Sequence, residues 1–218
     1  MDRRRAAGRR GARGALMRRA LRYDKAGDEH FNLISALHKS VRGSDPDAAL
    51  YWFARMLEGG EDPRYLARRL TRMAIEDIGL ADPQAQALCL DSWNTYDRLG
   101  SPEGELALAQ AVLYLALAPK SNAAYTAYKS ARTAAARTGS LTPPKHILNA
   151  PTRFMKDQGF GAGYVYDHDA EDGFSGQSYF PETLPRTVFY DPVERGFERD
   201  LRKRLDYFAR LRDQRHRG

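Results

Sequence analysis

The stretch DPDAALYWFARMLEGGEDP (residues 45–63) contains one helix together with its start and stop signals. It opens with Asp45-Pro46, its helical part closes at Gly59, and another Asp-Pro pair follows at once. An Asp at the N-cap accepts a hydrogen bond from an otherwise unpaired amide of the first turn. Proline in the next position has no amide to lose there, and its φ is already helical. The stretch therefore predicts a helix over residues 46–58.

The same punctuation recurs along the chain and predicts an all-α fold. Other capping residues followed by proline mark further starts, at Asp62-Pro63, Asp82-Pro83, Ser101-Pro102 and Asp191-Pro192. Glycines mark the stops, at Gly79, Gly100 and Gly139. The predicted helices cover residues 29–42, 46–58, 63–78, 83–98, 102–118, 121–137 and 192–213. Short connections between them favour an antiparallel helical bundle.

Residues 139–191 differ in composition from the rest of the chain. Their prolines and glycines exclude long helices. They also hold nine aromatic residues, whereas a disordered linker is poor in such residues. We therefore expect an ordered, irregular strap laid over the bundle, with a short helix near 150–158 and a short strand near 163–167.

The net charge of +7 lies at the two ends of the chain. Residues 1–22 carry +8 and residues 199–218 carry +5, so that the middle is mildly acidic at −6. Residues 1–14 consist mostly of Arg, Gly and Ala and are expected to be disordered. Arginine-rich segments can bind phosphate backbones without sequence preference. The candidate nucleic-acid contacts are Arg18, Arg19, Arg22, Arg199, Arg202, Lys203 and Arg204.

The basic C-terminal helix leaves two readings open. Its apolar residues form one stripe, which suits a helix docked on the fold with solvated charges outside. The same charges also suit a non-specific contact with DNA.

Cysteine content and hydropathy point to the cytosol. Cys89 is the single cysteine, so an internal disulfide is impossible and a reducing compartment fits. The longest apolar run, residues 106–118, is shorter than the roughly 20 residues of a membrane span. The arginine-rich start has no apolar stretch behind it, as a secretory signal would. We expect a cytoplasmic protein, associated with the bacterial nucleoid and with no membrane partner.

Two predicted helices are apolar on every side. Residues 48–57 are nearly all apolar, with Arg55 as the exception, and residues 106–118 are similar. A helix that is apolar all round must be covered all round. One of the two can be the centre of the bundle. The other is either covered by the chain's own strap and bundle or covered in part by a second chain, through Tyr51, Trp52, Phe53, Met56 and Leu57.

The sequence offers little for catalysis. It lacks the G-x-x-x-x-G-K-[ST] loop that cradles phosphate, so we expect no ATP hydrolysis by this chain alone and assign it no cofactor. Residues 166–173 alternate acids as a calcium loop does, but the glycine falls one position late, and Ser178 stands where a bidentate Glu belongs. An acidic surface turn is the favoured interpretation. A hydrolase metal site on Asp167, His168 and Asp169 is the remote one, and no catalytic residue is predicted.

A family resemblance rests on several ordered motifs. HFNLISALHKSVRGSDPDAALYW (residues 30–52) strongly resembles the C-terminal region of the replication-associated recombination protein A family, which includes the Werner-helicase-interacting ATPases. Further matches follow in order at residues 60–63 (GEDP), 68–70 (RRL), 76–83 (EDIGLADP), 119–122 (PKSN), 149–152 (NAPT) and 164–173. The resemblance runs from about Ala15 to about Leu211.

The resemblance implies a clamp-loader-like AAA+ ATPase that uses ATP and magnesium and acts on DNA with replication-fork proteins, in replication, recombination and repair. It implies a collar-like helical domain that forms homotetramers. The family's ATPase motifs lie upstream and are missing here, so the chain looks like a fragment. We expect a tail (1–14), a remnant of a lid helix and linker (15–27), an oligomerisation domain (28–138), the strap (139–191) and a basic helix (192–218). A stand-alone DNA-binding module is the alternative.

Overall fold

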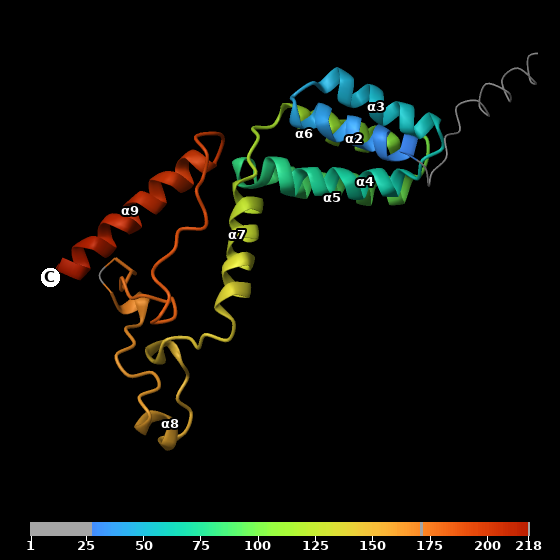
Figure 1. Ribbon diagram of the computed structural model, residues 1–218. Coiled ribbons are helices and arrows are strands. Elements are labelled where there is room, and N and C mark those ends of the chain that lie inside the picture. Colours follow the sequence, from blue (N-terminus) through green and yellow to red (C-terminus); the bar gives the residue numbers. More distant parts are fainter. Residues whose placement is uncertain (1–27, 171, 218) are drawn as a thin grey trace, which may run out of the picture. The chain divides into compact units, whose positions relative to one another are not determined.

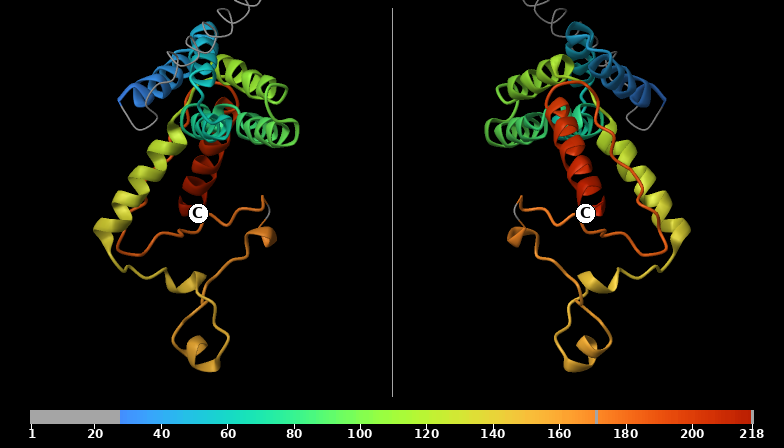
Figure 2. Two further views of the ribbon diagram at one scale, coloured as in Figure 1. Left: turned by 90° about the vertical axis from the view of Figure 1, so that its right-hand side faces the viewer. Right: turned by 90° about the vertical axis from the view of Figure 1, so that its left-hand side faces the viewer.

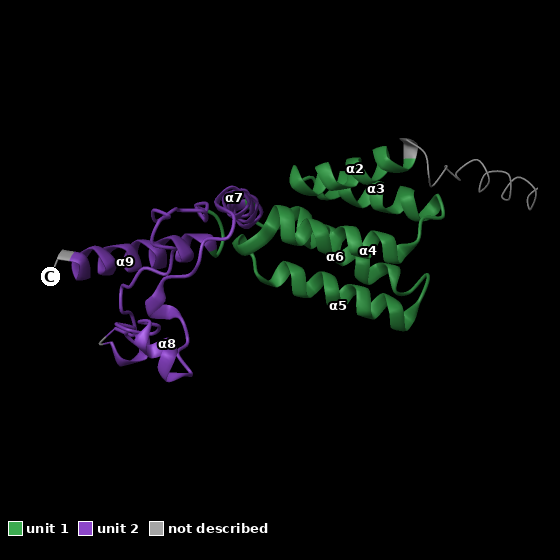
Figure 3. Cartoon of the chain, turned by 60° about the horizontal axis from the view of Figure 1, so that its bottom comes forward, with its two compact units in different colours: residues 1–122, 195–197 green, residues 123–194, 198–218 purple. Residues whose placement is uncertain are grey.

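The computed structural model describes residues 28–170 and 172–217, and every regular element among them is helical. The all-α prediction is confirmed. The chain divides into two compact units (Figure 3). Unit 1 contains the described residues up to Asn122 and residues 195–197, and unit 2 contains residues 123–194 and 198–217. Arg18, Arg19 and Arg22 lie outside the described residues, as do the predicted tail and lid remnant.

Unit 1 is a bundle of five α-helices (Figure 1). They are α2 (Asp28–Arg42), α3 (Pro46–Glu58), α4 (Pro63–Met73), α5 (Gln84–Leu99) and α6 (Glu105–Leu117). Helix α6 contacts all four others and is therefore the centre of the bundle. Its buried face supplies Leu108, Ala111, Val112, Leu115 and Ala116 to a core completed by α2, α3, α4 and α5.

Aspartate caps start the helices much as the sequence predicts. Asp45 Oδ1 accepts a hydrogen bond from the Ala48 amide at 2.9 Å, and α3 begins at Pro46. Asp62 Oδ1 accepts from the Arg64 amide at 2.9 Å, and α4 begins at Pro63. These two predicted starts are confirmed to the residue.

Two predicted helices of unit 1 are shorter than expected. The predicted 63–78 helix ends its regular part at Met73 and continues as a π-helical turn over Ala74–Ile78 and a 3-10 turn over Gly79–Ala81. There the Asp77 carbonyl accepts a hydrogen bond from the Ser121 amide at 2.7 Å, which lies outside the helix. The predicted 102–118 helix begins only at Glu105, after a turn over residues 101–104.

Unit 2 contains the long helices α7 (Ala123–Thr138) and α9 (Glu198–Arg217) and the irregular stretch between them. Short turns punctuate that stretch: a 3-10 turn at Lys145–Ile147, helix α8 at Arg153–Asp157 and a 3-10 turn at Asp167–Asp169. The expected short helix near 150–158 is confirmed by α8. Helix α7, expected within the bundle, belongs to unit 2.

The strand expected near residues 163–167 is wrong. Side-chain amide groups take the place of a neighbouring strand: Gln177 Nε2 donates to the Gly163 carbonyl at 2.7 Å, and the Val165 amide donates to Gln177 Oε1 at 3.2 Å. Gly163 also has φ +79°, outside the β region. The backbone here is held by one glutamine, so no sheet ladder forms.

Helix α9 begins at Glu198, six residues later than the Asp191-Pro192 signal predicts, and is one unbroken helix in both views of Figure 2. Gly196 has φ +53°, which a right-handed helix excludes. Asp191 does not cap the helix, because its carboxylate pairs with Arg202 at 2.7 Å. The fully buried Glu198 carboxylate instead accepts the Val193 amide at 2.9 Å. No helix among the described residues combines the length and hydropathy of a membrane-spanning segment.

Candidate functional site

The surface predicted on α3 is divided between core and solvent. Phe53 and Met56 are buried and belong to the core of unit 1. Trp52 and Leu57 are partly buried against that core, and Tyr51 is 59% exposed. Within these five residues, the surface that another chain could reach is therefore mainly Tyr51 with the edges of Trp52 and Leu57. Contact with a second chain stays a prediction.

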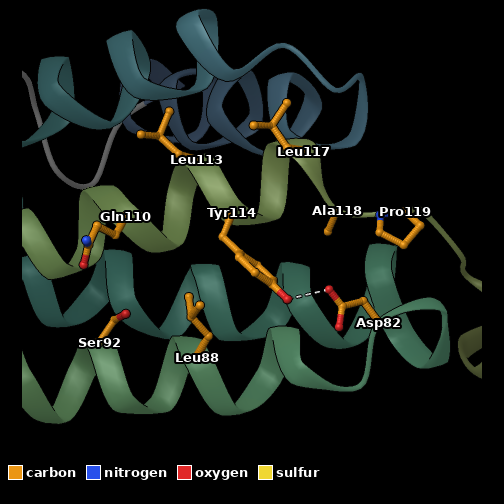
Figure 4. Close-up of a pocket in the computed structure, with 9 residues that line it drawn as sticks. All are labelled: Asp82, Leu88, Ser92, Gln110, Leu113, Tyr114, Leu117, Ala118 and Pro119. Carbon is orange, nitrogen blue, oxygen red and sulfur yellow. Dashed lines mark hydrogen bonds between the residues drawn. The ribbon is translucent and has the colours of Figure 1, made fainter. Parts of the chain in front are cut away.

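A second surface is an apolar groove between α5 and α6 (Figure 4). It encloses about 650 Å³. The apolar lining comes from both helices and from the chain that follows α6: Leu88, Leu113, Leu117, Ala118 and Pro119. Leu117 is 70% exposed although it stands next to the fully buried Ala116. Unit 1 thus leaves apolar side chains of its central helix open to solvent.

The polar wall of the groove is formed by Asp82 and Tyr114. The Tyr114 hydroxyl donates to Asp82 Oδ2 at 2.6 Å, and Figure 4 shows the ring pointing towards that carboxylate. This hydrogen bond and partial burial raise the pKa of Tyr114 to about 12. Asp82 Oδ1 accepts the Gln84 amide at 3.1 Å, so the same carboxylate also caps the start of α5.

The groove continues along α5 and α6. An adjoining hollow of about 550 Å³ shares Leu88, Ser92, Gln110 and Tyr114 with the first and extends the lining to Asp91 and Thr95. Of the residues described as lining the two hollows, Asp82 and Asp91 are the charged ones, and both are acidic. Sequence reasoning did not find this site, although it found the signal for it, namely that residues 106–118 are apolar on every side.

A buried ionic cluster joins α2 to the π-helical turn. The Asp77 carboxylate is 6% exposed and accepts hydrogen bonds from His38 Nε2 at 2.5 Å and Arg42 Nε at 2.6 Å. Burial raises the pKa of Asp77, but the hydrogen bonds from His38 and Arg42 together with their charges outweigh burial, so the pKa lies below its usual value. The three side chains pair with one another, and these contacts hold α2 against the π-helical turn.

The remaining reactive side chains of unit 1 are structural. Cys89 is buried in α5, and burial raises the pKa of its thiol to about 12. A thiol that stays protonated is a poor nucleophile and a poor metal ligand. His30 Nδ1 lies 2.8 Å from Glu61 Oε2 in a nearly buried pair.

The acidic turn of unit 2 is held by its own hydrogen bonds. Asp167 Oδ2 accepts from the Tyr179 hydroxyl at 2.6 Å, and Asp167 Oδ1 accepts from the Ser175 amide at 2.8 Å. These bonds lower the pKa of Asp167 to about 2, with Tyr179 as the largest cause. Throughout residues 28–170 and 172–217, no three His, Cys, Asp or Glu side chains gather as metal ligands.

The predicted basic contacts on α9 differ in their surroundings. Arg199, Lys203 and Arg204 are exposed. Arg202 is partly buried: its guanidinium donates to the Pro192 carbonyl and pairs with the Asp191 carboxylate. Arg202 therefore has a structural role at the start of α9, and Lys203 Nζ pairs with Asp200 Oδ1 at 3.1 Å on the exposed side of the helix.

Comparison with known proteins identifies the class of domain. The family model for the MgsA AAA+ ATPase C-terminal domain matches residues 43–209, and a model for the AAA C-terminal domain matches residues 3–42. The two models meet between Arg42 and Gly43, at the end of α2.

Relatives extend this match over most of the chain. Replication-associated recombination protein A of Coxiella burnetii is 54% identical over 194 residues, which cover 88% of this chain and 44% of the relative. The Escherichia coli K12 protein of the same name is 48% identical over 88% of this chain and 43% of its own length. ATPase WRNIP1 of Dictyostelium discoideum is 45% identical over 81% of this chain and 20% of its own length. This chain spans less than half the length of these relatives, and it belongs to the family of the MgsA AAA+ ATPase C-terminal domain.

Proposed function

We propose that this chain is an oligomerisation domain that forms a homotetramer. In that role it holds the ATPase modules of a clamp-loader-like AAA+ protein together for work on DNA at stalled replication forks. The observation that carries the proposal is the open apolar groove of unit 1. Its side chains extend from the central helix, with Leu117 70% exposed beside a fully buried neighbour.

The argument for assembly is one of exposed apolar surface. Scattered apolar side chains are common on monomers, but a contiguous apolar groove with a polar rim marks an interaction site. The exposed aromatic residue Tyr51 on α3, which packs against Trp52 at 5.0 Å between ring centroids, is a further candidate contact. The relatives named for replication-associated recombination and as an ATPase supply the context of the proposal.

The test is the solution mass of the chain, measured by light scattering behind a sizing column at several concentrations and two salt levels. We expect a species of about four times the chain's 24.6 kDa. Because the groove is mainly apolar, the mass should fall little at high salt, which screens only the contribution of charged residues. A clean monomer at high micromolar concentration would refute the proposal.

The proposal gives this chain no ATPase activity of its own. A phosphate-cradling loop is missing from its sequence, and the ATP and magnesium of the family belong to a module outside it. We expect purified chain to hydrolyse no ATP above background with DNA present. Turnover that rises with chain concentration and survives repurification would contradict this expectation.

Non-specific DNA binding is the second candidate function. The exposed basic residues Arg199, Lys203 and Arg204 of α9 favour it. Binding through phosphates should weaken steeply with salt. We expect replacement of these three residues by Gln to lower the salt slope, and removal of residues 1–14 tests the other basic end. Affinity unchanged by both would exclude this function.

A further inference from the structure

The α5–α6 groove has a definite length and charge. On α6 its lining runs from Ala107 to Leu117, eleven residues that span about 15 Å of helix. The end nearer Leu117 is mainly apolar, whereas the end nearer Ala107 mixes apolar with polar side chains, and the charged lining residues Asp82 and Asp91 are both acidic. The nearby Lys120 ammonium donates to the Ala116 and Ala118 carbonyls at 2.8 and 2.6 Å, so it is already engaged in closing the end of α6. The groove therefore suits a short amphipathic helix of positive charge.

Helix α9 has these properties. Its sequence carries eight Lys and Arg against four Asp and Glu. Its apolar stripe runs from Leu201 to Leu211, again eleven residues that span about 15 Å. Unit 2 covers this stripe incompletely: the Phe208 ring lies 5.1 Å from Phe174 between centroids, yet Leu205 and Phe208 remain 41% and 39% exposed. An amphipathic helix with a half-open stripe is a common ligand of an apolar groove.

We infer that α9 of one chain docks in the α5–α6 groove of a second copy. The inference rests on the proposed oligomerisation and names the surfaces that make it. Matching length, apolar character and opposite charge support the pairing. Because groove and helix are different patches, each contact is heterologous, and the proposed tetramer requires that four such contacts close into a ring.

The first test compares two leucines of α6 with the same exposure. Leu117 lines the groove, whereas Leu106 does not, and both are 70% exposed. Glutamine is a good helix former and carries no charge, so the helix dipole affects neither substitution. We expect Leu117→Gln to raise the dissociation constant of the assembly on the order of tenfold to a hundredfold, the effect of burying one leucine. Leu106→Gln should leave it unchanged, and circular dichroism should show both variants folded.

The second test asks which helix occupies the groove. Leu113→Cys and Leu205→Cys are made in separate chains, which are mixed and treated with a short bis-maleimide. These positions lie near the middle of the groove and of the stripe, so they meet whichever way the helix runs. We expect a crosslinked dimer of one chain of each kind. The unsubstituted chain is the control for the buried Cys89, and Lys203→Cys, on the opposite face of α9, replaces Leu205→Cys in the matched control.

The possible outcomes distinguish the docking of α9 from the proposed oligomerisation on which it rests. A monomeric unsubstituted chain refutes oligomerisation and the docking together. A tetramer that Leu117→Gln leaves intact, without a dimer crosslink, refutes the docking and leaves oligomerisation standing. A chain carrying both cysteines that crosslinks only within itself also refutes it, because the groove then holds its own α9.

Discussion

Removing the charge of Asp77 should destabilise unit 1 by about 1.5–4 kcal/mol. Asp77→Asn keeps the shape of the side chain but loses the carboxylate that His38 and Arg42 contact at 2.5 and 2.6 Å. A hydrogen bond to a charged group contributes roughly 1.5–3 kcal/mol. We assign the full range to the contact between His38 and Asp77, because both side chains are nearly buried. Arg42 is half exposed, so its share is discounted to the ~0–1 kcal/mol of surface pairs.

Tryptophan fluorescence during urea unfolding measures this loss of unfolding free energy in unit 1. The chain has two tryptophans, Trp52 and Trp93, and both pack against the core of unit 1. The matched control is Asp97→Asn, because Asp97 contacts Arg64 Nε at a similar 2.7 Å but is 41% exposed. We expect the control to cost less than about 1 kcal/mol. Equal midpoints for the two variants would refute the reasoning that burial makes the Asp77 cluster strong.

The same cluster sets a pH dependence with a definite sign. The pKa of Asp77 is lowered in the folded chain, while in the unfolded chain it is about 3.9. The stabilisation by the ionised Asp77 is therefore complete above about pH 4, and it is lost as the pH falls through the lowered pKa of Asp77 in the folded chain. The gap in unfolding free energy between the parent chain and Asp77→Asn should narrow below about pH 4. A gap that widens on acidification would contradict the sign.

Three further predictions concern single residues. Gly196→Ala should lower the free energy of unfolding by at least about 1–2 kcal/mol, because residue 196 has φ +53° and the added Cβ would lie 2.0 Å from the Ala81 carbonyl oxygen. An unchanged urea midpoint would contradict this close approach. Cys89, whose thiol has a pKa of about 12, should react with a maleimide at pH 8 only after unfolding, and fast labelling of the native chain would exclude its burial. Tyr114, also with a pKa of about 12, should ionise late in an absorbance titration together with Tyr190, whose pKa is raised further, so Tyr114→Phe should lower the amplitude of that late step; an unaltered amplitude would count against the bond of Tyr114 to Asp82.

Helix starts could be predicted where the signal is local. Asp45 and Asp62 cap the following turn with their own side chains, a contact that spans two or three residues. The Asp191-Pro192 signal failed because the Asp191 carboxylate pairs with Arg202, eleven residues away, and because Gly196 has a φ of +53° that no right-handed helix includes. The expected strand near residues 163–167 failed for a similar reason, since Gln177 supplies the hydrogen bonds that a neighbouring strand would. A local sequence pattern predicts contacts between residues that are close in sequence, whereas Arg202 and Gln177 contact their partners only because the fold brings them together.

The candidate groove shows what helix composition can and cannot determine. The sequence indicated that residues 46–58 and 106–118 each had more apolar surface than one stripe can bury. Which face stays uncovered depends on the number and placement of packing partners. Four helices surround α6 and still leave Leu113 and Leu117 open, whereas Phe53 and Met56 of α3 find their cover inside unit 1. Composition thus indicates how much apolar surface needs a partner, but only the topology decides which residues another chain can reach, and it leaves them in the α5–α6 groove more than on α3.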